Sequence, residues 1–154
     1  MEFDELSNRV IGCAIEVHRQ LGPGLLESTY EQCLSYEIKL NGIRSESQHP
    51  QPVEYKGVQR DCGYRVDLLV EDKLIIELKS VEQIKGIHEP HGIATGGIIP
   101  RGEAQLLTYM KLAGVKTGLL INFNVTRLKS GIKRFIISSL CGEKIWSVNP
   151  GTHQ

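Results

Sequence analysis

Residues 64–79, YRVDLLVEDKLIIELK, predict two short apolar strands joined by a charged turn. Charged side chains interrupt both strands, with Asp67 in the first and Glu77 and Lys79 in the second. An ionised side chain is costly to bury unless it is paired with an opposite charge or bound to a metal ion. The three charges therefore define a candidate functional site, and the rest of the chain forms its frame.

The length of the turn decides whether these charges meet. Side chains alternate between the two faces of a strand, so Glu77 and Lys79 share a face. An odd-numbered turn over residues 71–73, or a bulge, places Asp67 opposite Glu77, whereas a two-residue turn places it opposite Ile76. Facing carboxylates repel unless a cation lies between them, and their oxygens suit Mg²⁺ or Mn²⁺. A metal site thus predicts the odd-numbered turn or bulge; the alternative is a surface hairpin with charged edges.

Length and composition indicate one ordinary globular domain over residues 1–154. Hydrophobic residues make up 40% of the chain and charged residues 23%, values typical of soluble proteins. No apolar run approaches the roughly 20 residues of a membrane span, and the acidic N-terminal residues do not resemble a signal peptide. We therefore expect a cytoplasmic protein without a membrane partner. The four cysteines lack the clustered spacing of zinc or iron–sulfur sites.

The charges are balanced overall but unevenly distributed. The chain has 18 Lys and Arg and 18 Asp and Glu. Acidic residues outnumber basic ones up to residue 100, while Glu103 and Glu143 are the only acidic residues after it. An acidic part that contains metal ligands, next to a basic part, suits an enzyme that acts on phosphates. An ordinary solvated face of lysines explains the same counts.

Periodicity and turn signals predict a mixture of helices and strands along the chain. Strands are expected over 43–48 and 53–58, with residues 49–52 (HPQP) breaking a continuous strand between them and a turn region at 55–58. A Gly/Pro-rich loop is expected over 90–102, either as a lid or substrate guide or as an insertion without a role. The other predicted elements are helices over 4–20, 25–40 and 103–113 and strands over 117–123 and 132–137.

Two helices carry further candidate residues. Glu27 lies near the start of the second helix, where the helix dipole favours a carboxylate. Because it neighbours Tyr30 on the apolar stripe, Glu27 is also a candidate inward-pointing metal ligand. On the third helix, Gln105 and Tyr109 are four residues apart and therefore share a face.

Together, these motifs in this order resemble the PD-(D/E)xK nuclease superfamily, and more specifically its small GxxExxY family. The naming motif is Gly24, Glu27 and Tyr30 within residues 17–30, VHRQLGPGLLESTY. The other matching segments are YRVDLLV (64–70), IIELKSVE (75–82), AQLLTYMKL (104–112) and GLLINF (118–123). The resemblance covers roughly residues 6–137. It implies an α/β (α+β) fold with a restriction-endonuclease-like core, in which helices flank a mixed central β-sheet.

The resemblance also implies a role for each matching residue. Asp67, Glu77 and the Leu78 backbone carbonyl would bind a divalent metal ion, usually Mg²⁺. Glu27 would complete the metal site or hold a metal-bound water. Lys79 would orient or activate the attacking water and stabilise charge in the transition state. The QxxxY pair, Gln105 and Tyr109, would position the substrate and the active-site lysine.

The function implied is hydrolysis of phosphodiester bonds in DNA, in repair, recombination or defence. The insertion at 90–102 departs from the family, whose members pass quickly from the ExK strand to the helix that carries Gln105. A non-catalytic nucleic-acid- or partner-binding module on the same scaffold is therefore the alternative, and a metal-dependent enzyme acting on another phosphate is a third possibility. The sequence leaves the oligomeric state open.

Overall fold

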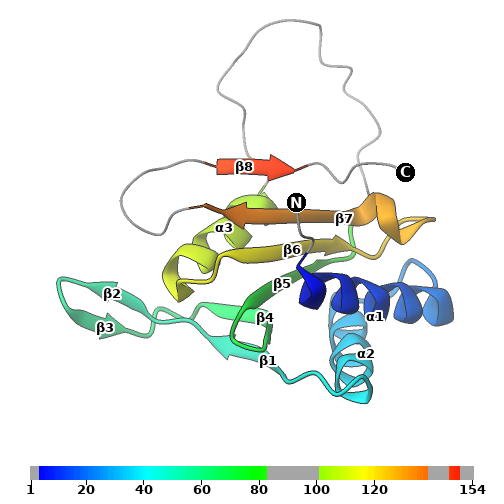
Figure 1. The fold of residues 1–154 in the computed structure, drawn as a ribbon, viewed down its shortest axis with the longest axis horizontal. Helices are drawn as coiled ribbons and strands as arrows, with labels where there is room; N and C mark the ends of the chain where they lie inside the picture. The colour runs from blue at the N-terminus through cyan, green and yellow to red at the C-terminus, as the bar shows by residue number, and fades with distance from the viewer. Residues whose placement is uncertain (1–3, 83–100, 139–145, 150–154) are drawn as a thin grey trace, which may run out of the picture.

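A six-stranded mixed sheet forms the centre of the molecule (Figure 1). The computed structural model describes residues 4–82, 101–138 and 146–149. Its helices are α1 (Glu5–Leu21), α2 (Glu27–Leu40), α3 (Arg101–Ala113) and the short 3₁₀ helix η1 (Leu128–Gly131). Its strands are β1 (Ser45–Pro50), β2 (Val53–Tyr55), β3 (Val58–Arg60), β4 (Arg65–Val70), β5 (Leu74–Lys79), β6 (Thr117–Asn122), β7 (Ile132–Ile137) and β8 (Trp146–Asn149).

The strand order of the central sheet is β1-β4-β5-β6-β7-β8. β5 and β6 run parallel, and the other neighbouring strands run antiparallel. β2 and β3 form a separate hairpin that projects from the body of the molecule (Figure 1). A mixed sheet with helices on both faces is consistent with the expected restriction-endonuclease-like fold, so the predicted fold class is confirmed.

The two faces of the sheet have separate hydrophobic cores. Leu74 and Ile76 of β5 pack in the core that contains residues of α1 and α2. Ile75, between them, packs in the core that contains Leu106 and Met110 of α3. Because β5 is covered on both faces, its sequence is apolar almost without a break. A charge in such a strand has little access to water.

The helix ends partly match the sequence prediction. Asp4 caps α1 at the start of the predicted helix, because its Oδ1 accepts a hydrogen bond from the Leu6 amide at 3.2 Å. The apolar stripe of α2 does not include Leu26 and Leu40, which are 74% and 61% exposed. The actual stripe includes Ile38. Leu26 is the residue that caps the helix and Leu40 is its last residue, so both lie beyond the part of the helix that packs on the sheet.

The strand predictions differ most at the edge of the sheet. Pro50 was expected to end the strand region, yet it is the last residue of β1 and pairs with Arg65. Proline is tolerated here because β1 is an edge strand. The predicted 53–58 strand is instead the hairpin of β2 and β3. The turn expected at 55–58 is confirmed, because Lys56 and Gly57 form it with positive φ. β8 was not predicted.

The predicted 90–102 loop lies outside the described residues except for Arg101 and Gly102. These two residues form the first turn of α3, which therefore begins two residues earlier than expected. Within residues 4–82, 101–138 and 146–149, no helix has the length and hydropathy of a membrane span.

Candidate functional site

The turn between β4 and β5 has the three residues that the metal hypothesis required. Val70 pairs with Leu74, which leaves residues 71–73 as the turn. Glu71 and Asp72 adopt positive φ angles of 50° and 55°. Because the register is antiparallel, the same count places Asp67 opposite Glu77.

The two opposed carboxylates sit where the backbone pairing of β4 and β5 gives way to side-chain contacts. The ladder of paired residues runs from the turn to Leu68 and Ile76. Beyond it, the Leu78 amide donates to Asp67 Oδ2 at 2.9 Å, and the Asp67 amide donates to Glu77 Oε1 at 3.3 Å. Each carboxylate thus accepts an amide from the opposite strand, which fixes both side chains in the gap.

Glu77 is held in an environment that disfavours its charge. The residue is only 2% exposed. Burial, followed by the neighbouring charge of Asp67, raises the pKa of Glu77 to about 8, against a smaller lowering effect from Lys79. A buried pair of carboxylates is stabilised in its charged form by a cation between its members.

Lys79 is half-buried beneath the first turn of α3. It shares a strand face with Ile75, which packs in the α3 core. A Cβ atom placed on Gly102 would lie 3.2 Å from Lys79 Cε. The absence of a side chain at Gly102 therefore lets the helix lie close against the lysine stem. The Phe123 amide donates to the Lys79 carbonyl at 2.9 Å and holds the strand end.

Glu27 reaches the same end of β5 from α2. Its Oε1 accepts a hydrogen bond from the Ser80 amide at 3.2 Å, one residue beyond Lys79. The side chain is exposed rather than buried among the apolar residues of the helix. Glu27 therefore lies at the helix start, as the dipole favours, and also beside the candidate site.

Two residues that the sequence analysis did not assign to the site also lie there. Gln48 donates from Nε2 to Glu31 Oε2 at 2.8 Å and to Asp67 Oδ1 at 3.4 Å. Burial raises the pKa of Glu31, the hydrogen bond from Gln48 lowers it, and the charge of Asp67 raises it. Glu31 follows Glu27 by one helical turn, which was a usable signal. No sequence signal identified Gln48. It is an exposed residue of an edge strand, and its positive φ of 52° could not be predicted from the sequence.

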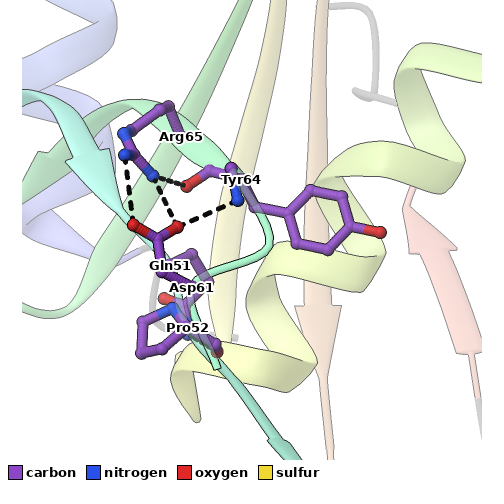
Figure 2. A network of polar contacts seen from close by, with 6 residues as sticks. Gln51, Pro52, Asp61, Tyr64 and Arg65 are labelled. Atoms are coloured by element: carbon purple, nitrogen blue, oxygen red, sulfur yellow. Dashed lines mark hydrogen bonds and ion pairs between the residues drawn. The ribbon is translucent and has the colours of Figure 1, made fainter. Parts of the chain in front are cut away.

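The two residues of the predicted QxxxY pair are hydrogen-bonded to each other. Gln105 Nε2 donates to the Tyr109 hydroxyl at 2.9 Å, and Tyr109 is 3% exposed. The Tyr109 ring meets the Tyr64 ring edge to face, with centroids 5.9 Å apart. Figure 2 shows the Tyr64 ring pointing toward α3, with Arg65 donating to Asp61 and to the Tyr64 carbonyl. Among the described contacts, none joins this pair to the Asp67 and Glu77 carboxylates.

A pocket of about 530 Å³ lies away from these carboxylates. It is bounded by β2 and β3 residues Glu54 and Gln59 and by the end of α3 at Lys111 and Ala113. None of the candidate site residues lines it. The candidate site is therefore not part of this pocket.

The donor atoms at the carboxylate pair suit a hard divalent cation. Asp67 and Glu77 supply carboxylate oxygens, and such oxygens are the ligands that Mg²⁺ and Mn²⁺ prefer. Burial and the charge of Asp67 raise the pKa of Glu77, and a nearby cation favours the charged form of a carboxylate. Among residues 4–82, 101–138 and 146–149, no group of three or more His, Cys, Asp or Glu side chains is arranged to hold a metal ion. The pair fits a metal ion, and further oxygens would come from the backbone, water or substrate.

Comparison with known protein families places the whole arrangement in a family context. The family model for the PD-(D/E)XK nuclease superfamily matches residues 4–135. The chain belongs to this superfamily. Nucleases of this superfamily generally use divalent metal ions. Membership in the superfamily suggests nuclease activity and nucleic-acid binding for this chain. No curated protein and no solved structure matches the chain.

Proposed function

We propose that this member of the superfamily is a nuclease of the GxxExxY family that hydrolyses phosphodiester bonds in DNA with Mg²⁺ or Mn²⁺. The observation that supports it is the pair formed by Asp67 and the buried Glu77, whose carboxylates each accept an amide from the opposite strand in a partly buried gap beside Lys79. Charges are placed in this arrangement at a cost in stability, as expected of a catalytic site. DNA repair, recombination or defence, in the cytoplasm, is the biological setting we propose.

In this proposal, the carboxylates and one carbonyl hold the metal ion. Asp67, Glu77 and the Leu78 carbonyl are the ligands, and Glu27 completes the site or holds a metal-bound water. When bound, the ion supplies charge stabilisation to the phosphate and lowers the pKa of water. Gln48 supports this set, because its amide orients Asp67 Oδ1.

Lys79 orients the attacking water and stabilises the charge that develops on the phosphate oxygens. The Gly102 backbone of α3 limits the positions of its stem. Gln105 and Tyr109 position substrate from the same helix. Residues 1–154 form one nuclease domain in which 90–102 is an insertion between the ExK strand and this helix.

The proposal is tested first by calorimetric titration of Mn²⁺ and Mg²⁺ into the wild type and the Asp67→Ala and Glu77→Ala variants. Both variants are expected to lose the binding that the wild type shows and to lose cleavage of plasmid and linear DNA. Asp72→Ala is the matched control, because this carboxylate of the same hairpin is 68% exposed and pairs with Arg44. Wild-type cleavage by both variants would overturn the site assignment.

One observation favours a second candidate, a non-catalytic nucleic-acid- or partner-binding module. Gln105 is hydrogen-bonded to Tyr109, and among the described contacts neither residue reaches Asp67 or Glu77, so this pair is not joined to the carboxylates. DNA binding that persists in EDTA, without cleavage in any divalent metal, would support this candidate over the nuclease.

A further inference from the structure

Three exposed apolar side chains border the carboxylate site. Leu26 is 74% exposed, Val81 51% and Leu25 39%. Leu26 directly precedes Glu27, and Val81 follows Lys79 by two residues. We call Leu25, Leu26 and Val81 the apolar rim. An exposed group of large apolar side chains beside a charged site is a common sign of a binding surface.

Hydrogen bonds join the two parts of the rim to the site. Ser80 Oγ donates to the Leu25 carbonyl at 2.5 Å, and the Ser80 amide donates to Glu27 at 3.2 Å. Asn122 Oδ1 accepts a hydrogen bond from the Val81 amide at 3.3 Å, and Asn122 Nδ2 donates one to the Val81 carbonyl at 3.0 Å. The rim therefore continues directly from the ends of β5 and β6, where the metal-ligand candidates lie.

A buried tyrosine fixes the loop that carries the leucines. The Tyr30 hydroxyl donates to the Gly22 carbonyl at 2.5 Å and accepts the Leu25 amide at 3.1 Å. Its ring is fully buried and stacks on Phe123 with centroids 4.4 Å apart. Leu25 and Leu26 are thus held outward by a fixed backbone, which reduces the entropy lost when a ligand binds them.

The charges around the rim limit the kind of ligand that fits it. Glu27 accepts the Ser80 amide next to the rim, and Gln48 joins Glu31 to Asp67 of the carboxylate pair. An anionic group binds next to these carboxylates only when a metal ion lies between them. The rim itself offers only apolar contacts. In a nucleic acid, the group next to a bound phosphate that suits apolar contact is a base. Apolar side chains, leucine among them, contact and unstack bases in other nucleic-acid complexes.

We propose that the apolar rim holds an unstacked base of the DNA strand whose phosphate is bound at Asp67 and Glu77. This inference rests on the proposed function, since the carboxylates place the phosphate. It specifies the substrate class as single-stranded or end-frayed DNA, because a base in an intact duplex is not free to leave its stack without the cost of unpairing.

The test uses oligonucleotides that carry 2-aminopurine, whose fluorescence rises when the base leaves its stack. The full chain is mixed with single-stranded and blunt duplex oligonucleotides in Ca²⁺, which replaces Mg²⁺ so that binding is measured without relying on cleavage. We expect a fluorescence rise at one position of the single strand and a weaker rise in the duplex interior. Leu26→Ala should remove the rise and weaken single-strand binding about fivefold.

Leu40→Ala is the matched control, because Leu40 is a 61% exposed leucine at the other end of α2. It should leave fluorescence and affinity unchanged. A wild-type rise that Leu26→Ala retains overturns the inference while leaving DNA cleavage and the proposed function intact. A rise that depends on Leu26 in a protein that cuts no DNA supports base binding and rejects the nuclease. A wild type without any rise, or a rim that dimerises the chain instead, also overturns the inference.

Discussion

The two ends of the β4–β5 hairpin carry the same kinds of residue and differ in what surrounds them. The turn end has Glu71, Asp72 and Lys73, while the open end has Asp67, Glu77 and Lys79. At the turn, Asp72 is 68% exposed and pairs with Arg44 at 2.8 Å. At the open end, Glu77 is 2% exposed and faces another carboxylate. Burial and register, rather than residue type, therefore separate a solvated turn from a candidate reaction centre.

The largest contrast is expected between the two lysines. Lys79→Ala should lower cleavage about 10²–10³-fold, because it removes a charge aimed at the transition state. Divalent metal affinity should stay within about threefold, since the lysine is not a ligand. Lys73→Ala is the control and should cut DNA as the wild type does. Equal activity of the two variants would remove Lys79 from the mechanism.

The two glutamates should differ in their effect on stability with pH. The folded-state pKa of Glu77 is raised from 4.5 to about 8, so the folded protein keeps a proton that the unfolded chain releases. Stability of the metal-free protein should therefore fall as pH rises from about 4.5 to 8, by a few kcal/mol in all. Glu77→Gln should flatten this part of the profile of denaturant midpoint against pH, whereas Glu71→Gln should not. A fall that persists in Glu77→Gln would assign it to another group.

A smaller effect is expected from the contact over Lys79. In Gly102→Ala the new Cβ would lie 3.2 Å from Lys79 Cε and 3.6 Å from Leu120 Cδ1, so the lysine stem must shift slightly. We expect kcat to fall a few-fold with KM and melting temperature little changed. Gly12→Ala in α1, where nothing lies within 4 Å, should raise stability by up to about 1 kcal/mol and leave kcat alone. Unchanged kcat in Gly102→Ala would show that this contact does not position the lysine.

The smallest effect is expected at the turn. Arg44→Ala removes an exposed ion pair with Asp72, and such pairs contribute about 0–1 kcal/mol. Chemical denaturation should detect a loss within this range, and cleavage should be unaffected. A loss of cleavage would mean that the turn communicates with the open end of the hairpin.

The sequence predicted those parts of the site that depend on local pattern. The charges of Asp67 and Glu77 are conspicuous because they interrupt apolar strands. The sequence left the length of the turn open, and the three-residue turn of the structure sets their register. Gln105 and Tyr109 share a helix face, as the spacing of four predicts, and the structure adds a hydrogen bond between them. Spacing along a helix, however, does not say how far the pair lies from the carboxylates.

Tertiary contacts decided the remaining features. Gln48 entered the site because a left-handed backbone in an edge strand lies opposite Asp67, and a single exposed glutamine carries no pattern. In the sequence, Glu31 resembles any solvated glutamate of a helix. In the fold, partial burial raises its pKa. Pro50 could extend β1 only because no further strand of the described sheet lies outside it. These outcomes depend on neighbours far apart in the chain.

The parallel pairing of β5 with β6 has a consequence for the order of folding. The β4–β5 hairpin closes over three residues, whereas β6 reaches β5 only after the chain passes through α3. Short loops close at a lower entropic cost than long ones. We therefore expect Asp67 and Glu77 to come together while water still surrounds them and their repulsion is weak. The cost of burying the pair falls on the later step in which α3 and β6 dock, so a divalent cation present at that step would favour docking.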